Sequence, residues 1–128
     1  METTSAFDEL IGSRVTEAGP DRTVVELPVS RALHQPGGIV HGGVYCALVE
    51  GAASTGATLW LEGSGIAVGT SNHTDFLKAV RDGVLRAEAT PLQRGSRLQL
   101  WQVEVTDGTA TLVAHGKVKL LNLRETPG

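Results

Sequence analysis

The stretch QPGGIVHGGVYCALVEGAASTGATLW, residues 35–60, carries a single formal charge, Glu50, among alanines, glycines and valines. Its composition predicts one helix over about residues 41–60, roughly 30 Å long, which Gly63 and Gly65 end. A helix with a single charge has almost no face suited to water, so the rest of the chain must pack around it. The stretch therefore predicts a fold built on one central helix.

The segments on both sides of this helix predict β-strands. Residues 23–29 alternate between apolar and polar side chains, and Pro28 confines this strand to an edge or an end. Residues 13–18 are its expected hairpin partner. Further strands are expected at residues 66–80, 85–90, 98–105 and 112–120, with an Asp-Gly hairpin turn within 106–109. The prediction is an α+β fold in which an antiparallel sheet of five to six strands wraps one long central helix, in a single domain spanning residues 1–128.

The strand at residues 98–105 does not follow one alternation. Leu98 and Leu100 fall on even positions, whereas Trp101, Val103 and Val105 fall on odd ones. Two explanations remain open: a bulge near Trp101, or a strand covered on both faces.

Composition excludes several classes of protein. A net charge of −3 without a basic stripe argues against a nucleic-acid partner. The single cysteine, Cys46, and an N-terminus without signal-peptide character predict a cytoplasmic protein. The weakly polar run at residues 44–61 contains Glu50 and several hydroxyl side chains, so we expect no membrane partner.

Glu50 falls on the small-residue side of the predicted helix. A helical wheel places the large side chains of Val44, Tyr45, Leu48 and Leu59 in one sector, which we expect to face the sheet. The neighbours of Glu50 on the wheel are small: Gly43, Cys46, Ala47, Ala53, Ser54 and Ala57. A glutamate that loses water in such a helix is costly unless it is paired or protonated, and no cation lies within four residues. Solvation and pairing with a distant arginine are the structural interpretations; proton transfer or nucleophilic attack is the functional one.

The start of the same helix offers a second functional feature. Gly42 and Gly43 leave the first amide N–H groups unobstructed, where the helix dipole adds partial positive charge. Such amides suit a developing oxyanion. Gly42 lies about 12 Å from Glu50 along the helix axis, so the two could flank one ligand.

The segment HQPGGIVHGGVYCALVEGAAS, residues 34–54, resembles the hotdog-fold acyl-CoA thioesterases of the phenylacetyl-CoA, 4-hydroxybenzoyl-CoA and 1,4-dihydroxy-2-naphthoyl-CoA group. The resemblance continues through VGTSNHTDFLKAVRDGVLRAEATPLQRGSRLQLWQVEVTD, residues 68–107. The most specific part is His-Gly-Gly with an acid nine positions after His41, and Gln35 fifteen positions before that acid.

The resemblance implies a hydrolase that splits an acyl-CoA into a free acid and CoA. Glu50 would act as nucleophile or general base, and the Gly42 amide would polarise the thioester carbonyl. Gln35 would orient the thioester or water, His41 would start the helix, and Ser54 would hold the hydrolytic water. The implied substrate-binding residues are Gly69, Phe76, Leu77, Lys78, Ala79, Gln93, Arg94, Gly95, Ser96, Arg97 and Leu98. Among these, Lys78, Arg94 and Arg97 are candidate phosphate partners, with solvated surface charge as the equal alternative.

We expect no cofactor, because CoA is part of the substrate, and no metal, because histidines 34, 41, 73 and 115 match no metal-binding spacing. Cys46 is interpreted as packing rather than as a nucleophile. The resemblance also implies a homodimer, or a homotetramer made of two dimers, in which Gln35 and Glu50 face each other across subunits.

Two other functions stay open. One is a non-catalytic module that binds acyl-CoA as a sensor. The other, weaker alternative is a hydratase or dehydratase acting on acyl thioesters, whose catalytic Asp and His lie closer together than His41 and Glu50. The acyl group is expected to be aromatic or medium-chain, with a slight preference for a bulky aromatic group.

Overall fold

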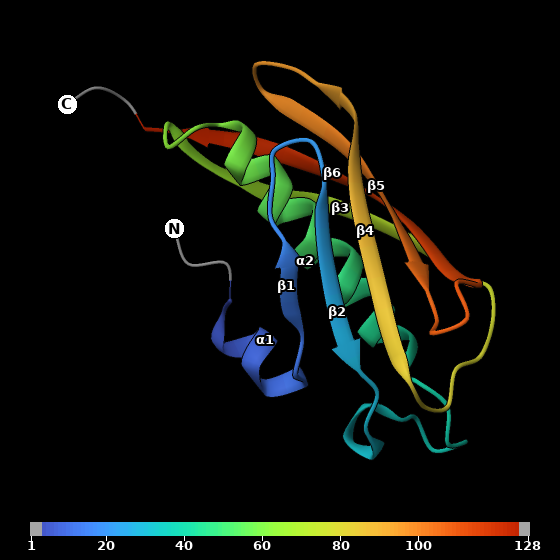
Figure 1. Cartoon of the computed structure of the whole chain (residues 1–128). Helices are drawn as coiled ribbons and strands as arrows, with labels where there is room; N and C mark the ends of the chain where they lie inside the picture. Colours follow the sequence, from blue (N-terminus) through green and yellow to red (C-terminus); the bar gives the residue numbers. More distant parts are fainter. Residues whose placement is uncertain (1–3, 126–128) are drawn as a thin grey trace.

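The computed structural model describes residues 4–125. Its central element is a long helix, α2, which lies against one antiparallel sheet of six strands in the order β1-β2-β4-β5-β6-β3 (Figure 1). The elements are α1 (Ala6–Ile11), β1 (Arg14–Glu17), β2 (Thr23–Pro28), a short 3₁₀ helix (Arg31–Leu33), α2 (Gly42–Trp60), β3 (Gly65–Phe76), β4 (Val84–Arg94), β5 (Leu98–Thr106) and β6 (Leu112–Arg124). This arrangement confirms the predicted α+β class and the predicted central helix.

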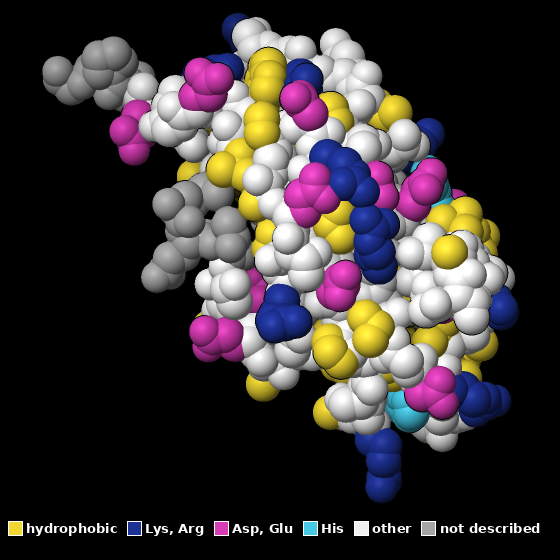
Figure 2. Space-filling view, viewed as in Figure 1, with side chains coloured by type: hydrophobic (Ala, Val, Ile, Leu, Met, Phe, Trp, Pro, Cys, Tyr) yellow, Lys and Arg dark blue, Asp and Glu magenta, His cyan; other side chains and the backbone are white. Residues whose placement is uncertain are grey.

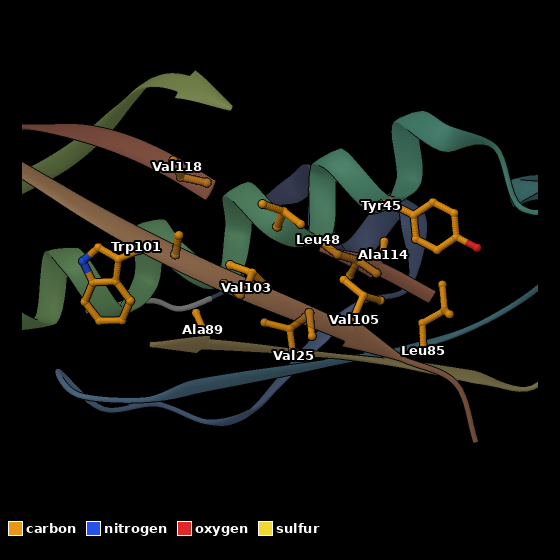
Figure 3. Packing of buried hydrophobic residues seen from close by; sticks show 14 of the residues in the cluster. Val25, Tyr45, Leu48, Leu85, Ala89, Trp101, Val103, Val105, Ala114 and Val118 are labelled. Carbon is orange, nitrogen blue, oxygen red and sulfur yellow. The ribbon is translucent and has the colours of Figure 1, made fainter. Parts of the chain in front are cut away.

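Small residues let α2 approach the sheet closely. A Cβ atom on Gly56 would lie 2.6 Å from the Trp101 ring, and one on Gly116 would lie 2.5 Å from a Val49 methyl carbon. Figure 3 shows Leu48 of α2 over the inward side chains of the sheet. Since these contacts leave no space for a side chain, the two glycines fix the distance between helix and sheet.

The strand predictions before α2 are confirmed. β1 pairs antiparallel with β2, as expected for the hairpin partner. Pro28 is the last residue of β2, where its missing N–H costs no hydrogen bond inside the ladder.

The break in the apolar–polar alternation of β5 is caused neither by a bulge in β5 near Trp101 nor by burial of both faces of the strand. The odd positions of β5 are all buried, including Gln99 at 1% exposure, while Leu98 is 43% exposed. Gln99 occupies an inward position because its amide is fully hydrogen-bonded, and Leu98 and Leu100 therefore point outward. The register shift lies in the neighbouring strand, between Pro91 and Gln93.

The sheet leaves one side of α2 open, contrary to the expectation that it nearly engulfs the helix. Tyr45, Leu48 and Val49 are buried, whereas Val44 and Leu59 are only half-buried. Ala53 and Ala57 also belong to the buried face, not to the Glu50 side as the wheel suggested. α1 covers part of the open side: Asp8 lies 4.0 Å from the position of a Cβ on Gly51.

The outer face of the sheet is polar near β2 and β4. Arg22 binds both Glu17 and Glu88, and Arg86 binds Glu88 at 2.9 Å. These hydrogen bonds from Arg22 and Arg86 hold the pKa of Glu88 below its usual range. Figure 2 shows basic and acidic side chains gathered side by side on this face.

No helix within residues 4–125 is long and apolar enough to cross a membrane.

Candidate active site

The open side of α2 forms one wall of a cavity of about 950 Å³. Residues of α1, including Phe7, and of β3, including Asn72, form other parts of its wall. The α2 residues that line it are Gly43, Cys46, Ala47, Glu50, Gly51, Ser54, Thr55 and Thr58. They extend along most of the helix, so the cavity is long enough for an elongated ligand.

Glu50 is the only acidic or basic side chain that α2 contributes to this cavity. The residue is exposed in the single chain, so the expectation that it loses water is wrong for one chain taken alone. Pairing with a distant arginine, the other structural interpretation, is not found among residues 4–125. Gly69 of β3 faces the carboxylate: a Cβ there would lie 3.1 Å from the Glu50 carboxyl carbon.

Asn72 orients the carboxylate and was missed in the sequence. Its Nδ2 donates to the Cys46 carbonyl at 3.0 Å and to Glu50 Oε1 at 3.4 Å. Its Oδ1 accepts a hydrogen bond of 2.7 Å from the Thr74 hydroxyl. Because a carbonyl can only accept, the contact with Cys46 requires the nitrogen side of the amide to face the helix.

A bulge in β3 explains why the sequence pattern did not reveal Asn72. Ala67 and Gly69 pair with inward positions of β6, but the register shifts between Gly69 and Ser71. After the shift the even-numbered residues, Asn72 and Thr74, face the helix, opposite Val118 and Gly116. A bulge re-aims side chains in this way.

Ser54 lies one helical turn after Glu50 and lines the same cavity. Its hydroxyl donates to the Glu50 carbonyl oxygen. The hydroxyl oxygen keeps its lone pairs, so it can accept a hydrogen bond from a water molecule in the cavity.

The two glycine N–H groups at the start of α2 differ in whether they make a hydrogen bond. The Gly43 N–H donates to Nδ1 of His41, the N-cap residue, at 2.9 Å. No hydrogen bond from the Gly42 N–H is present within residues 4–125. A Cβ on Gly42 would lie 2.5 Å from the Phe76 ring, so this glycine is needed for packing as well. Gly42 is therefore the one candidate oxyanion donor of the pair.

Two predicted catalytic side chains lie outside the Glu50 cavity of the same chain. His41 lines a separate cavity of about 320 Å³ near the start of α2. Gln35 lines neither cavity, and its side-chain oxygen accepts a hydrogen bond from the Gly37 amide.

The predicted substrate-binding stretches lie at opposite ends of α2. Phe76, which the exposed residues Leu77, Lys78 and Ala79 follow, packs on Gly42 at the start of the helix. Arg94, within the stretch from Gln93 to Leu98, lies 5.2 Å from the Trp60 ring at the end of the helix. One chain does not bring the two stretches together.

Residues 4–125 contain no group of three or more His, Cys, Asp or Glu side chains placed to hold a metal ion. Cys46 is half-buried and lines the Glu50 cavity. His34 contacts the Arg81 carbonyl at 2.7 Å, and His73 lies 3.8 Å from Asp75.

Known proteins share this sequence and fold. Residues 37–114 match the thioesterase superfamily. A Mycobacterium tuberculosis protein named "Putative esterase" is 44% identical to this chain. The aligned region covers 99% of this chain and 93% of the length of that protein. Its structure superposes with a TM-score of 0.93 over 96% of this chain and 100% of its own. A 1,4-dihydroxy-2-naphthoyl-CoA hydrolase of Listeria monocytogenes is 34% identical over 84% of this chain and 87% of its own.

A solved thioesterase of Haemophilus influenzae, 29% identical, has a TM-score of 0.90 and covers 94% of this chain and 85% of its own. The fold is thus the hotdog fold of thioesterases. The chain belongs to the thioesterase superfamily, and the prediction of an enzyme in the thioester hydrolase class is confirmed.

Proposed function

We propose that this protein is an acyl-CoA thioesterase that hydrolyses an aromatic or medium-chain acyl-CoA to a free acid and CoA, with no added cofactor. The observation that carries the proposal is the position of Glu50. Its carboxylate lines a long cavity, Asn72 and Ser54 lie beside it, and the cavity belongs to a thioesterase-family chain.

Two routes fit a carboxylate in this position. As a general base, Glu50 takes a proton from a water molecule whose oxygen attacks the thioester carbonyl; the C–S bond then breaks and CoA leaves as the thiol. As a nucleophile, Glu50 attacks the same carbonyl, the C–S bond breaks, and CoA leaves as a thiolate that takes up a proton. Water then hydrolyses the resulting anhydride to the free acid and restores the Glu50 carboxylate. In both routes the carbonyl oxygen gains negative charge, which the Gly42 amide would stabilise by about 3 kcal/mol.

A second copy of the chain would complete the site. β3 is an edge strand of the sheet, and its residues around Asn72 are exposed. A long exposed edge strand is a template for pairing with another chain. Pairing of two β3 strands in a homodimer would cover the open side of α2, remove water from Glu50 and bring Gln35 of one subunit toward Glu50 of the other. Two such dimers would form a homotetramer.

The substitution Glu50→Gln tests the proposal, because it keeps the shape of the side chain and removes its charge. We expect turnover of benzoyl-CoA and octanoyl-CoA to fall by at least about 100-fold, with CoA binding nearly unchanged. A wild-type protein that binds these thioesters tightly and hydrolyses none of a broad panel would favour the acyl-CoA sensor instead.

A further inference from the structure

Two neighbouring cavities lie along the open side of α2. The Glu50 cavity has a volume of about 950 Å³, and the cavity near the start of α2 has a volume of about 320 Å³. Among residues 4–125, those that line both are Phe7, Gly43 and Ala47. Gly43 has no side chain and Ala47 has only a methyl group. The large side chain at the boundary between the two cavities is therefore Phe7.

The short helix α1 holds Phe7 at this boundary, and Asp8 fixes both ends of the helix. Asp8 Oδ2 accepts a hydrogen bond of 2.9 Å from the Ser5 backbone N–H, and Asp8 Oδ1 accepts one of 3.3 Å from the Ser13 hydroxyl. Ile11, one turn after Phe7, packs against the buried core. Because α1 is tied at its start, at its end and on one face, the Phe7 ring has a defined place opposite α2.

The wall that α2 contributes to the Glu50 cavity changes in polarity along the helix. Toward the end of α2 the lining residues carry hydroxyl groups: Ser54, Thr55 and Thr58. Toward the start of α2 they carry no side-chain oxygen or nitrogen: Gly43, Cys46 and Ala47. Hydroxyl oxygens can accept hydrogen bonds from the amide N–H groups of a pantetheine arm, whereas an alkyl or aryl group gains most from an apolar wall. The acyl group of a bound thioester is therefore expected to extend toward the start of α2, where Phe7 lies.

The smaller cavity continues in this direction beyond Phe7. The apolar side chains that line it there are Ile11, Ala32, Leu33 and Val44. Two imidazoles also line it, and each has a partner within the chain. His34 contacts the Arg81 carbonyl at 2.7 Å, and His41 accepts a hydrogen bond of 2.9 Å from the Gly43 N–H. An alkyl chain can lie in this cavity without breaking either contact.

We infer that Phe7 is a specificity-determining residue that limits the length of the acyl group. The acyl chain ends against the Phe7 ring, which keeps it out of the smaller cavity. Removal of the ring would join the two cavities along Gly43 and Ala47. Each methylene that leaves water strengthens binding about fourfold, so access to the smaller cavity favours longer chains. The inference rests on the proposed function, because it takes the acyl group of an acyl-CoA as the ligand.

The test measures Kd by isothermal titration calorimetry for S-octyl-CoA and S-dodecyl-CoA. In these thioethers a methylene group replaces the carbonyl, so they cannot be hydrolysed. The proteins are wild type, Phe7→Ala and, as a matched control, Leu10→Ala. Leu10 lies on the same helix and lines neither cavity. Phe7 is 53% exposed and Leu10 is 81% exposed, so neither truncation should unfold the protein.

We expect F7A to bind S-dodecyl-CoA at least about tenfold more tightly than S-octyl-CoA, because the four added methylenes enter the smaller cavity. Wild type and L10A should show no such preference. If F7A does not fold, Phe7→Leu replaces it, because leucine is shorter than phenylalanine and is a strong helix former.

A double variant tests whether the added chain occupies the smaller cavity. Ala32 is exposed and lines the smaller cavity but not the Glu50 cavity. Ala32→Trp should fill that space, so F7A/A32W should lose the preference for S-dodecyl-CoA, and A32W alone should behave as wild type. A merely structural role of Phe7 would not be reversed by a bulky residue on another element.

Hydrolysis gives a second readout. For F7A, the ratio of kcat/KM for dodecanoyl-CoA to that for octanoyl-CoA should rise about tenfold over wild type, and the ratio for L10A should not change. The kcat of F7A with octanoyl-CoA should stay near that of wild type, because the substitution leaves Glu50 and its neighbours in place.

The results separate the inference from the proposed function. The inference would be overturned by an unchanged Kd ratio in F7A, by the same preference for S-dodecyl-CoA in wild type, by a preference that persists in F7A/A32W, or by no binding of either thioether. An unchanged ratio in a wild-type protein and an F7A variant that both hydrolyse octanoyl-CoA would leave the proposed function intact. Protein that hydrolyses no thioester but shows the expected Kd pattern would end the proposed function and support the role of Phe7.

Discussion

Gly69 on β3 faces Glu50 on α2 so closely that a Cβ on the glycine would lie 3.1 Å from both the carboxyl carbon and Oε2. Gly69→Ala should displace the carboxylate without harming the fold, because the displaced atoms are the end of a flexible, exposed side chain. We expect kcat for an acyl-CoA to fall about tenfold or more, since a small displacement of a catalytic group is costly.

The control for this substitution is Gly108→Ala. A Cβ on Gly108 would meet nothing within 4 Å, and its φ angle is not positive. Both variants should melt close to wild type, and only G69A should lose activity. Full activity in G69A would show that the position of the Glu50 carboxylate does not limit the reaction.

The amide of Gly42 can be tested by removing it with proline. Gly42 is the first residue of α2, where proline is well tolerated, and His41 before it has φ −62° and ψ 134°, which a following proline permits. Any side chain at residue 42 would strike Phe76, so both variants need the Phe76→Ala background.

The comparison is between G42P/F76A and G42A/F76A, which differ mainly in the amide donor. We expect the proline variant to lose a further 100-fold or so in kcat, with equal helicity by circular dichroism. Equal activity in the two would remove Gly42 from the proposed mechanism.

The sequence predicted those parts of the fold in which polarity follows secondary structure. The limits of α2 and the hairpin of β1 and β2 are visible because apolar residues recur with the helical or strand period. Gln99 and Asn72 break this rule: Gln99 is buried because its amide is fully paired, and Asn72 faces the helix because of the bulge after Gly69. Both depend on contacts between distant segments, which periodicity does not record.

The exposure of Glu50 was not predicted for a related reason. The wheel correctly placed Glu50 with Cys46, Ala47 and Ser54, but it could not show whether sheet, α1 or another subunit covers that side. A single sequence specifies which faces are apolar and small, and it does not specify how many chains share them.

The proposed sharing of the site between two subunits predicts complementation. Gln35→Ala and Glu50→Gln should each be nearly inactive, but their co-expression should restore activity. Half of the dimers in an equal mixture are mixed, and each mixed dimer has one intact site of two, so about a quarter of wild-type activity should return.

Ser54→Ala with Glu50→Gln is the matched negative control, because both substitutions lie on the same helix and no mixed dimer has an intact site. Recovery must therefore appear in the first pair and not in the second. Absence of recovery in the first pair, with mixed dimers demonstrated by mass spectrometry, would place the complete site within one chain.

The acid sensitivity of the fold should depend in part on Glu88. Its pKa is lowered from the ordinary value of 4.5, first by the hydrogen bond from Arg22 and then by that from Arg86. A lowered pKa in the folded state means that ionised Glu88 stabilises the fold above pH 4.5, and that this contribution is lost as the pH falls through 4.5 and then through the lower folded-state pKa.

Glu88→Gln should therefore lower Tm by a few degrees at pH 7, and the difference from wild type should shrink as the pH falls below 4.5. The effect is modest because the ion pairs are partly exposed, with 31% of the Glu88 side chain accessible. Glu62→Gln serves as the control, since Glu62 is exposed and makes no ion pair within residues 4–125. Thermal melts of the three proteins between pH 3 and pH 8 give the comparison; parallel curves for wild type and E88Q would show that the ion pairs on this face do not contribute to stability.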